Sequence, residues 1–252
     1  MKRFLLCLSP FLLFAFIYNS MRYYPNYLFG TIDIEGVYNA EKSLFGILSN
    51  GVLLTPNEYF RIYHCALMDI LSGVFYLCWV PLPVFYSAWL YFTGERQLSF
   101  RLSCAFLFVN LIGFCGYYIH PAAPPWYVMQ YGFTPVFSTP GNVAGFENFD
   151  SLLGIPLFHS IYSGNANVFA AIPSLHAAYC PIALFYACKV RNNTPWIVLL
   201  GIVSAGIWFS AVYSGHHYVI DVLLGILTTI VGIFLFELIY RRIPLKWLAW
   251  LD

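Results

Sequence analysis

Residues 214–225 read SGHHYVIDVLLG and open the last apolar stretch of the chain, residues 218–240. Two histidines, His216 and His217, are followed by Asp221, four positions after the second. Residues i and i+4 of a helix share a face. The spacing therefore predicts that Asp221 holds the His217 imidazole through Nδ1 and leaves Nε2 free as a nucleophile. Asp221 is a functional candidate because a carboxylate within a membrane is costly without a partner. A purely structural hydrogen bond between helices is the alternative.

The composition indicates an integral membrane protein. Of the 252 residues, 60% are hydrophobic and only 9% are charged, whereas soluble domains carry roughly 25% charged residues. The net charge of +1 and the lack of a basic cluster give no indication of nucleic-acid binding. The seven cysteines are odd in number, scattered, and placed in or beside apolar runs. This pattern favours packed thiols over disulfides or a zinc site.

Six apolar segments predict an all-α fold, a polytopic membrane helix bundle with six transmembrane helices. The first segment is short and follows Lys2 and Arg3, as in a signal peptide. We expect it to be retained, because FIYNSM has no small-x-small cleavage site. A shorter apolar segment, residues 44–54, predicts an interfacial or re-entrant helix. The expected spans are residues 4–18, 65–92, 102–119, 174–188, 196–212 and 218–240.

The distribution of Lys and Arg predicts the orientation of the bundle. With the N-terminus in the cytoplasm, nine basic residues fall on the cytoplasmic side, and only Arg22, Lys42 and Arg61 fall on the outer side. The stretches YIHPAAPPW, AAIPSLHAAY and VYSGHHYVIDVLLG then all lie at the outer interface. The sequence thus predicts an active site on the extracytoplasmic face. A bacterial inner membrane is the favoured location, and a Golgi membrane is the alternative.

The stretch IPSLHAAY, residues 172–179, supplies a second candidate group. Pro173 suits the first turn of a helix. The N–H groups of Ser174 and Leu175 would then be free to bind an anion, with the Ser174 hydroxyl as a further donor. His176 would stand in the same turn. An ordinary helix start with a histidine at the lipid interface is the alternative.

Taken together, these groups favour phosphoryl transfer through a covalent phosphohistidine. Zinc bound by His176, His216, His217 and Asp221 is the competing interpretation. It is less favoured because adjacent histidines point in different directions on a helix, and no metal or cofactor is expected. For the same reason His216, about 100° around the helix from His217, is a secondary substrate-binding candidate.

The motifs PSLH and HHYVID resemble the second and third signatures of the type-2 phosphatidic acid phosphatase superfamily. The chain departs from that pattern where Ala211 and Gly113 replace an Arg and a Lys, and where the first signature ends in His120-Pro121. These departures and HPAAPPWYVMQYG resemble the inositol phosphorylceramide synthase branch. The resemblance implies a catalytic core over residues 63–252, after a first transmembrane helix and interfacial segment in residues 1–62.

The same resemblance implies a reaction and three catalytic roles. Members of this branch move phosphoinositol from phosphatidylinositol to the hydroxyl of ceramide. His217 would be the nucleophile, Asp221 its orienting partner, and His176 the general acid and then base. The missing cations fit this chemistry, because a phosphodiester carries one negative charge and needs fewer positive partners than a phosphomonoester. Arg61 or Lys42 folding over the site would weaken that inference.

Further residues are candidates for contact with the lipid substrates. An aromatic lid that excludes water is expected from Trp126, Tyr127, Tyr131, Phe133 and Phe137, with an interfacial aromatic belt as the alternative. His120 would stand in for the lost Arg, or form a helix-end hydrogen bond. Asp69 would bind a substrate hydroxyl, although pairing with His64 or Arg61 is favoured. The candidate substrate-binding set is Ser174, His120, Trp126, Tyr127, His216 and Asp69.

Two other functions compete with this one. A lipid phosphatase, or a phosphatase of polyprenyl pyrophosphates, would use the same histidines. A scramblase or transporter would need a polar path across the membrane, whereas the polar residues here stop near one interface. The expected partners are a donor lipid and an acceptor lipid, similar to phosphatidylinositol and ceramide. The sequence motifs alone fit several head groups.

Overall fold

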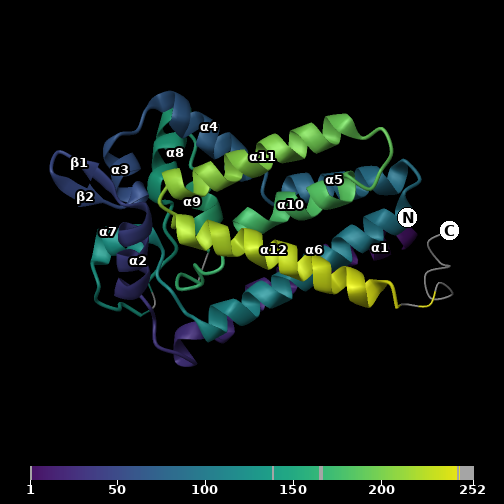
Figure 1. Cartoon of the computed structure of the whole chain (residues 1–252), viewed down its shortest axis with the longest axis horizontal. Helices are drawn as coiled ribbons and strands as arrows, with labels where there is room; N and C mark the ends of the chain where they lie inside the picture. The colour runs from purple at the N-terminus through teal and green to yellow at the C-terminus, as the bar shows by residue number, and fades with distance from the viewer. Residues whose placement is uncertain (1, 138, 165–166, 243, 245–252) are drawn as a thin grey trace.

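The structure is a computed structural model that describes residues 2–137, 139–164, 167–242 and 244. It is an elongated bundle of apolar helices with a layer of short elements at one end (Figure 1). The bundle consists of α1 Lys2–Ser20, α4 Ala66–Leu77, α5 Pro81–Phe92, α6 Arg96–Ile119, α10 His176–Ala187, α11 Thr194–Tyr213 and α12 Val219–Tyr240. The start of α1 and the end of α12 lie at the end of the bundle opposite the short elements.

The layer of short elements, called the cap below, comes from two parts of the chain. Its first part precedes α4 and its second part lies between α6 and α10. The cap is composed of η1 Met21–Tyr23, η2 Asn26–Leu28, α2 Glu35–Phe45, β1 Ile47–Ser49, β2 Val52–Leu54, α3 Pro56–Ile62, α7 Pro125–Tyr131, η3 Ala144–Phe146, α8 Glu147–Leu153 and α9 Leu157–Tyr162.

The described helices do not confirm six membrane spans. Four of them (α1, α6, α11 and α12) are long and apolar enough to cross a membrane, and a fifth span results if α4 and α5 count as one element bent by 45°. The expected fourth span corresponds to α10, which has 12 residues. At 1.5 Å per residue it is roughly 18 Å long, short of a hydrocarbon core of about 30 Å.

Residues 44–54 do not form the helix expected from the sequence. The helix α2 precedes this segment and ends at Phe45, and residues 47–54 form an antiparallel β-hairpin in which Ile47 pairs with Leu54. The turn is Asn50-Gly51, and both residues have positive φ, 49° and 79°. Asn-Gly is the preferred pair for a two-residue hairpin turn, because both central residues must adopt positive φ. The prediction of an interfacial or re-entrant helix here was therefore wrong.

Three segments distant in sequence are joined between the cap and the bundle. The Asp33 N–H donates to the Pro121 carbonyl at 2.8 Å, and the Ala123 N–H donates to the Asp33 carbonyl at 3.0 Å. On the other side, the Ala122 N–H donates to the Phe169 carbonyl at 2.9 Å. These bonds fix the non-helical segment that leads into α10. Buried backbone without helical hydrogen bonds requires such partners.

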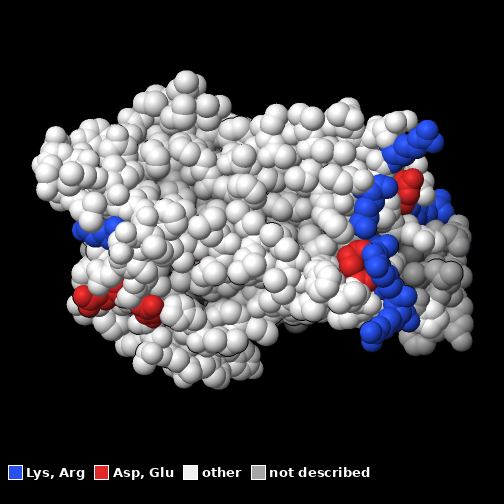
Figure 2. Space-filling view, viewed as in Figure 1, with Lys and Arg blue, Asp and Glu red and all other residues white. Residues whose placement is uncertain are grey.

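Basic side chains gather at the end of the bundle away from the cap (Figure 2). One buried carboxylate takes part in this arrangement: Glu237 of α12 accepts a hydrogen bond from Arg101 Nε at 2.8 Å and lies 3.5 Å from Lys189 Nζ. The basic residues of the helix ends that meet there are Lys2, Arg3, Arg96, Arg101, Lys189, Arg191, Arg241 and Arg242. Lys246 lies outside the described residues.

Candidate active site

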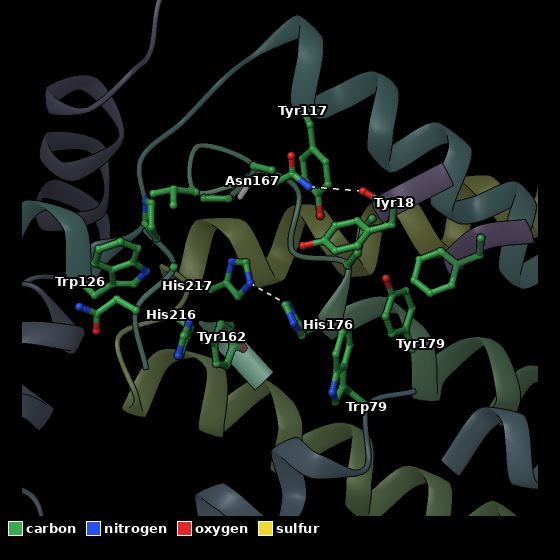
Figure 3. Close-up of a pocket in the computed structure, with 18 residues that line it drawn as sticks. Tyr18, Trp79, Tyr117, Trp126, Tyr162, Asn167, His176, Tyr179, His216 and His217 are labelled. Carbon is green, nitrogen blue, oxygen red and sulfur yellow. Dashed lines mark hydrogen bonds between the residues drawn. The ribbon is translucent and has the colours of Figure 1, made fainter. Parts of the chain in front are cut away.

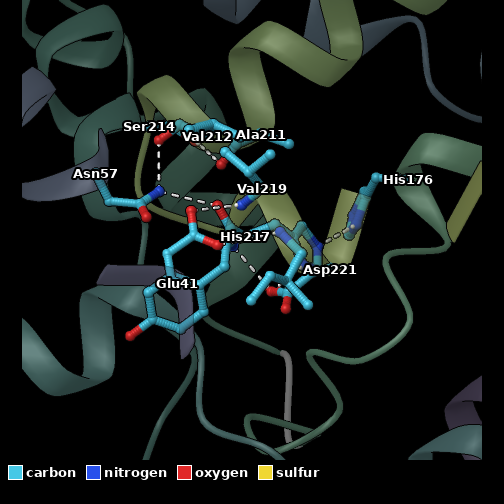
Figure 4. A network of polar contacts seen from close by, with 11 residues as sticks. Glu41, Asn57, His176, Ala211, Val212, Ser214, His217, Val219 and Asp221 are labelled. Atoms are coloured by element: carbon cyan, nitrogen blue, oxygen red, sulfur yellow. Dashed lines mark hydrogen bonds and ion pairs between the residues drawn. The ribbon is translucent and has the colours of Figure 1, made fainter. Parts of the chain in front are cut away.

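Three side chains stand in a row where α10, α11 and α12 meet the cap (Figure 4). His217 Nε2 lies 3.0 Å from His176 Nδ1. On the other side of the ring, His217 Nδ1 lies 3.4 Å from Asp221 Oδ2. Both His217 and Asp221 are buried, at 5% and 0% exposure. The order carboxylate, imidazole, imidazole gives His217 an orienting partner at one nitrogen and a proton-transfer partner at the other.

The local fold that produces this row differs from the expected shared helix face. His217 precedes α12, which begins at Val219. The chain reverses at Gly215, whose φ is +77°, and the backbone N–H groups of His216 and His217 both donate to the Ala211 carbonyl. Asp221 lies in the first turn of α12, where its Oδ2 also accepts the Tyr218 N–H at 2.9 Å. One carboxylate oxygen therefore caps the helix and faces the imidazole.

The predicted anion site at Ser174 is not formed as expected. The helix α10 begins at His176, and the Ser174 N–H donates to the Asp221 backbone carbonyl at 2.9 Å. This backbone N–H is therefore unavailable to a substrate. The Ser174 hydroxyl, in contrast, is fully buried and has no hydrogen-bond partner. Close packing joins the two motifs here, because a Cβ at Gly225 would clash with the Ser174 carbonyl.

A narrow cavity of about 60 Å³ surrounds the two imidazoles (Figure 3). The His176 ring stacks on Tyr76 and packs against Trp79, with ring centroids 4.9 and 4.5 Å apart. The described lining of this cavity includes no Lys or Arg. It is mostly aromatic and apolar: Phe14, Tyr18, Trp79, Tyr117, Pro124, Trp126, Gly141, Asn142, Tyr162, Asn167, Val168, Ala170, Ala171, Leu175, His176, Tyr179, His216 and His217.

His216 is turned into an aromatic cluster. Its Nε2 lies 3.1 Å from the Val143 carbonyl oxygen. Its ring stacks on Tyr162 and Phe146, with centroids 4.4 and 5.1 Å apart. The zinc interpretation would bring a ring nitrogen of His216 to the same ion as His176 and His217, whereas this ring is stacked in the aromatic cluster and its Nε2 is engaged with the cap. These contacts indicate that His216 anchors the cap to the segment 213–217 that leads from the end of α11 to α12, which is called the catalytic turn below.

The remaining candidates are distributed over the cap. Trp126 lines the cavity, and Figure 3 shows His217 between Trp126 and His176. Tyr127 is fully buried and hydrogen-bonds through its hydroxyl to the Thr134 carbonyl at 2.9 Å. His120 lies 3.2 Å from Asp33 and is not part of the cavity lining. The structure therefore brings only Trp126 of these three to the imidazoles.

Asp69 occurs in a separate polar cluster. Its Oδ2 lies 3.1 Å from His64 Nδ1, and its Oδ1 accepts a hydrogen bond from the Tyr213 hydroxyl at 2.8 Å. The favoured pairing of Asp69 with His64 is thus confirmed. Neither residue lines the cavity around His217.

Two buried residues near the catalytic turn were missed by sequence reasoning. Glu41 of α2 is fully buried and accepts the N–H groups of Val219 and Ile220 at 2.9 and 3.1 Å. Asn57 donates through Nδ2 to the Val212 and His217 carbonyls at 2.7 and 2.9 Å. Glu41 thereby supplies acceptors for two N–H groups of the first turn of α12, which have no partner within the helix. No local signal could show this, because Glu41 is 178 residues from its partner Val219.

We expect Glu41→Ala to lower kcat about tenfold with little change in KM for the donor lipid. The carboxylate holds the first turn of α12, and hence Asp221, without lining the cavity around His217. The variant should also lose roughly 1–3 kcal/mol of stability, the usual cost of a buried donor left unpaired. Rates of transfer and detergent-phase unfolding temperatures provide the measurements. Glu35→Gln on the exposed part of the same helix is the matched control, and a variant with normal kcat would refute the positioning role.

Burial also changes the titration of the two histidines between α11 and α12. Burial lowers the pKa of His217 to about 4, although the Ala171 carbonyl opposes the change. Burial and then the charge of His217 lower the pKa of His216 to about 3. Both rings are therefore neutral near pH 7. A neutral His217 has the lone pair that nucleophilic attack requires.

These pKa values predict that the protein loses stability in mild acid. An unfolded histidine titrates near 6.5, so between pH 6.5 and 4 these two histidines bind more protons in the unfolded chain than in the native one. Stability must then fall as the pH drops through this range. Unfolding temperatures from pH 7 to 4.5 should show the decline, and His216→Phe should make it shallower. An equal slope in the variant would contradict the contribution of His216.

A bundle of apolar helices with two imidazoles and a carboxylate in contact at one end defines this protein as an integral membrane enzyme. Residues 57–235, more than half of the chain, match the model of the PAP2 superfamily. The chain belongs to the PAP2 superfamily. No solved structure matches it.

Curated relatives extend this comparison. A phosphoinositol dihydroceramide synthase of Bacteroides thetaiotaomicron is 54% identical over 236 residues, which are 94% of this chain and 77% of the relative. An inositol phosphorylceramide synthase of Candida albicans is 29% identical over 63% of this chain and 35% of its own length. The catalytic subunit of that enzyme from Saccharomyces cerevisiae is 26% identical, over 86% of this chain and 52% of its own length. The chain thus spans about a third to a half of the fungal relatives.

Proposed function

We propose that this protein transfers phosphoinositol from a phosphatidylinositol-like lipid to the hydroxyl of ceramide or dihydroceramide. The transfer passes through a phosphohistidine on His217. The contact between His217 Nε2 and His176 Nδ1, with Asp221 behind, carries the proposal. The name of the Bacteroides relative, 54% identical over most of both chains, supports the substrates.

In the first half-reaction, His217 Nε2 attacks phosphorus while Asp221 stabilises the positive charge that develops on the ring. The bond from phosphorus to the diacylglycerol oxygen breaks. Protonated His176 gives its proton to that oxygen, a contribution of about 10²–10⁴-fold. Diacylglycerol leaves, and inositol phosphate remains bonded to Nε2 as a phosphodiester-like adduct.

In the second half-reaction, the acceptor hydroxyl gives its proton to His176 and its oxygen attacks phosphorus. The bond from phosphorus to Nε2 breaks, and His217 is restored. His176 ends in its starting protonation state, so protons balance over the cycle. The same two residues therefore serve both half-reactions with opposite direction of proton transfer.

The cavity around His217 supports a transferase of diesters. Its described lining contains no Lys or Arg, which suits a single negative charge better than a dianion. Its small volume and aromatic lining also disfavour bulk water, whose attack would turn the enzyme into a hydrolase. Ser174, whose buried hydroxyl has no hydrogen-bond partner, is the proposed donor to the phosphoryl oxygens. Trp126 forms the wall of this cavity on the side of His217 that faces away from His176.

We place the site at the extracytoplasmic face of a membrane crossed six times. The basic helix ends away from the cap support this orientation (Figure 2), because positive charge favours the cytoplasm. In this arrangement, the non-helical residues 167–175 and α10 together complete the fourth crossing. The similarity to a Bacteroides protein supports a bacterial inner membrane.

Transfer of a labelled head group tests the proposed function. Purified protein is incubated with phosphatidylinositol labelled in the inositol, with and without ceramide. The expected result is label on ceramide, with release of diacylglycerol. Release of free phosphate from phosphatidic acid, without transfer of label to ceramide, would instead support a lipid phosphatase and contradict the proposal.

A further inference from the structure

A second cavity, about 660 Å³ in volume, lies between the cap and the ends of α4 and α11, beside the catalytic one. It falls within the roughly 300–1,000 Å³ range of small-molecule sites. The two cavities share Trp126 and Asn142 in their lining. The catalytic turn also runs from one to the other: Tyr213, Ser214 and Gly215 line the second cavity, and His216 and His217 line the first.

The second cavity is rich in hydrogen-bonding side chains of several kinds. Asp69 is its buried centre, held by His64, by the Tyr213 hydroxyl and by Asn148 Nδ2 at 3.4 Å. Together they present a carboxylate, an imidazole, an amide and a phenol to one space. Closely spaced donors and acceptors of this kind suit a ring that carries several hydroxyl groups, because each hydroxyl both donates and accepts.

Two further groups in this lining have unused hydrogen-bonding capacity. Asn57 is 1% exposed and its Oδ1 has no hydrogen-bond partner, although its Nδ2 makes two bonds. Arg61 is exposed and forms no ion pair or hydrogen bond with any described residue. A buried acceptor without a donor is uncommon in proteins and calls for a partner. A polyol next to the catalytic turn would supply donors to Asn57 and acceptors to Arg61.

We infer that this cavity binds the cyclitol ring of the donor lipid. The inference rests on the proposed function, because the cavity would bind the head group of the donor lipid while its phosphorus lies at His217. The ring is joined to phosphorus through one oxygen and must therefore occupy space next to the reaction centre. The aromatic cavity leaves little room for it, whereas the polar one adjoins it through Trp126 and Asn142.

Head-group recognition is tested with Arg61→Gln and Asn148→Ala in the full-length protein. Each should raise KM for phosphatidylinositol about tenfold, the worth of one hydrogen bond of about 1.4 kcal/mol, with kcat within about twofold. Soluble glycerophosphoinositol should inhibit the unmodified protein more strongly than glycerophosphoglycerol, and both variants should lose that preference. Arg22→Gln, an arginine outside this lining, is the matched control and should behave like the unmodified protein.

The outcomes separate the two proposals. If the unmodified protein moves no phosphoinositol to ceramide, the proposed function fails and the cyclitol site fails with it. If it does so, but both variants keep the KM and the inhibitor preference, the cyclitol site alone is overturned. Unfolding temperatures equal to that of the unmodified protein show that a raised KM reflects lost recognition.

Discussion

The variant His217→Gln is expected to lose phosphoinositol transfer by at least about 10⁴-fold, as enzymes do when the nucleophile is removed. Glutamine keeps polarity and similar length but cannot form a covalent bond to phosphorus. Its replacement should also leave the local fold intact, because the backbone of residue 217 supplies the bonds to Ala211 and Asn57. The loss should therefore appear in kcat and not in the unfolding temperature.

The measurement for His217→Gln combines turnover with trapping of the intermediate. A donor labelled in its phosphate should leave acid-labile label on the unmodified protein when the acceptor is withheld. No label should remain on the variant. His159→Gln, a histidine in the exposed part of α9, is the matched control. Normal turnover or normal labelling by His217→Gln would defeat the covalent mechanism.

The second large effect is expected at His176 and depends on the leaving group. With phosphatidylinositol, His176→Gln should lower the rate about 10²–10⁴-fold, because the departing alkoxide receives no proton. In a nitrophenyl ester of inositol phosphate, the leaving group is nitrophenolate, which departs without that proton. The variant should therefore still release one equivalent of nitrophenol quickly and then stall, since the acceptor hydroxyl has no base.

A burst experiment with the nitrophenyl ester checks this separation of roles. The unmodified protein with ceramide should turn over continuously, His176→Gln should give a burst alone, and His217→Gln should give neither. If His176→Gln loses the burst as severely as it loses transfer from phosphatidylinositol, His176 does not act as the general acid. The stacking of His176 on Tyr76 then becomes its main role.

The predicted site depended on local spacing and was largely recoverable from the sequence. The i, i+4 relation brought Asp221 to His217 at 3.4 Å, although through a helix cap and not a shared helical face. The contact between His176 and His217 joins residues 41 apart and followed only from placing both motifs at one interface. Glu41 and Asn57 could not be found in this way, because their partners lie 178 and 155 residues away.

The errors in the fold have the same physical origin. Apolar content predicts that a segment is buried but not how its backbone hydrogen bonds are satisfied. Residues 47–54 form a hairpin because Asn50 and Gly51 allow positive φ. The expected fourth span, residues 174–188, is helical only from His176 to Ala187, and the Ser174 N–H that precedes this helix donates to the Asp221 carbonyl.

The sequence by itself determined the membrane character, the PSLH and HHYVID motifs and which of the two adjacent histidines, His217, faces Asp221. These follow from hydropathy and from spacing within a few residues, which local geometry fixes. Only the tertiary structure decided where α10 begins, that Glu41 caps α12, and that a polar cavity adjoins the catalytic one. Those features consist of contacts between distant segments, which form when buried polar groups must find partners in the folded chain.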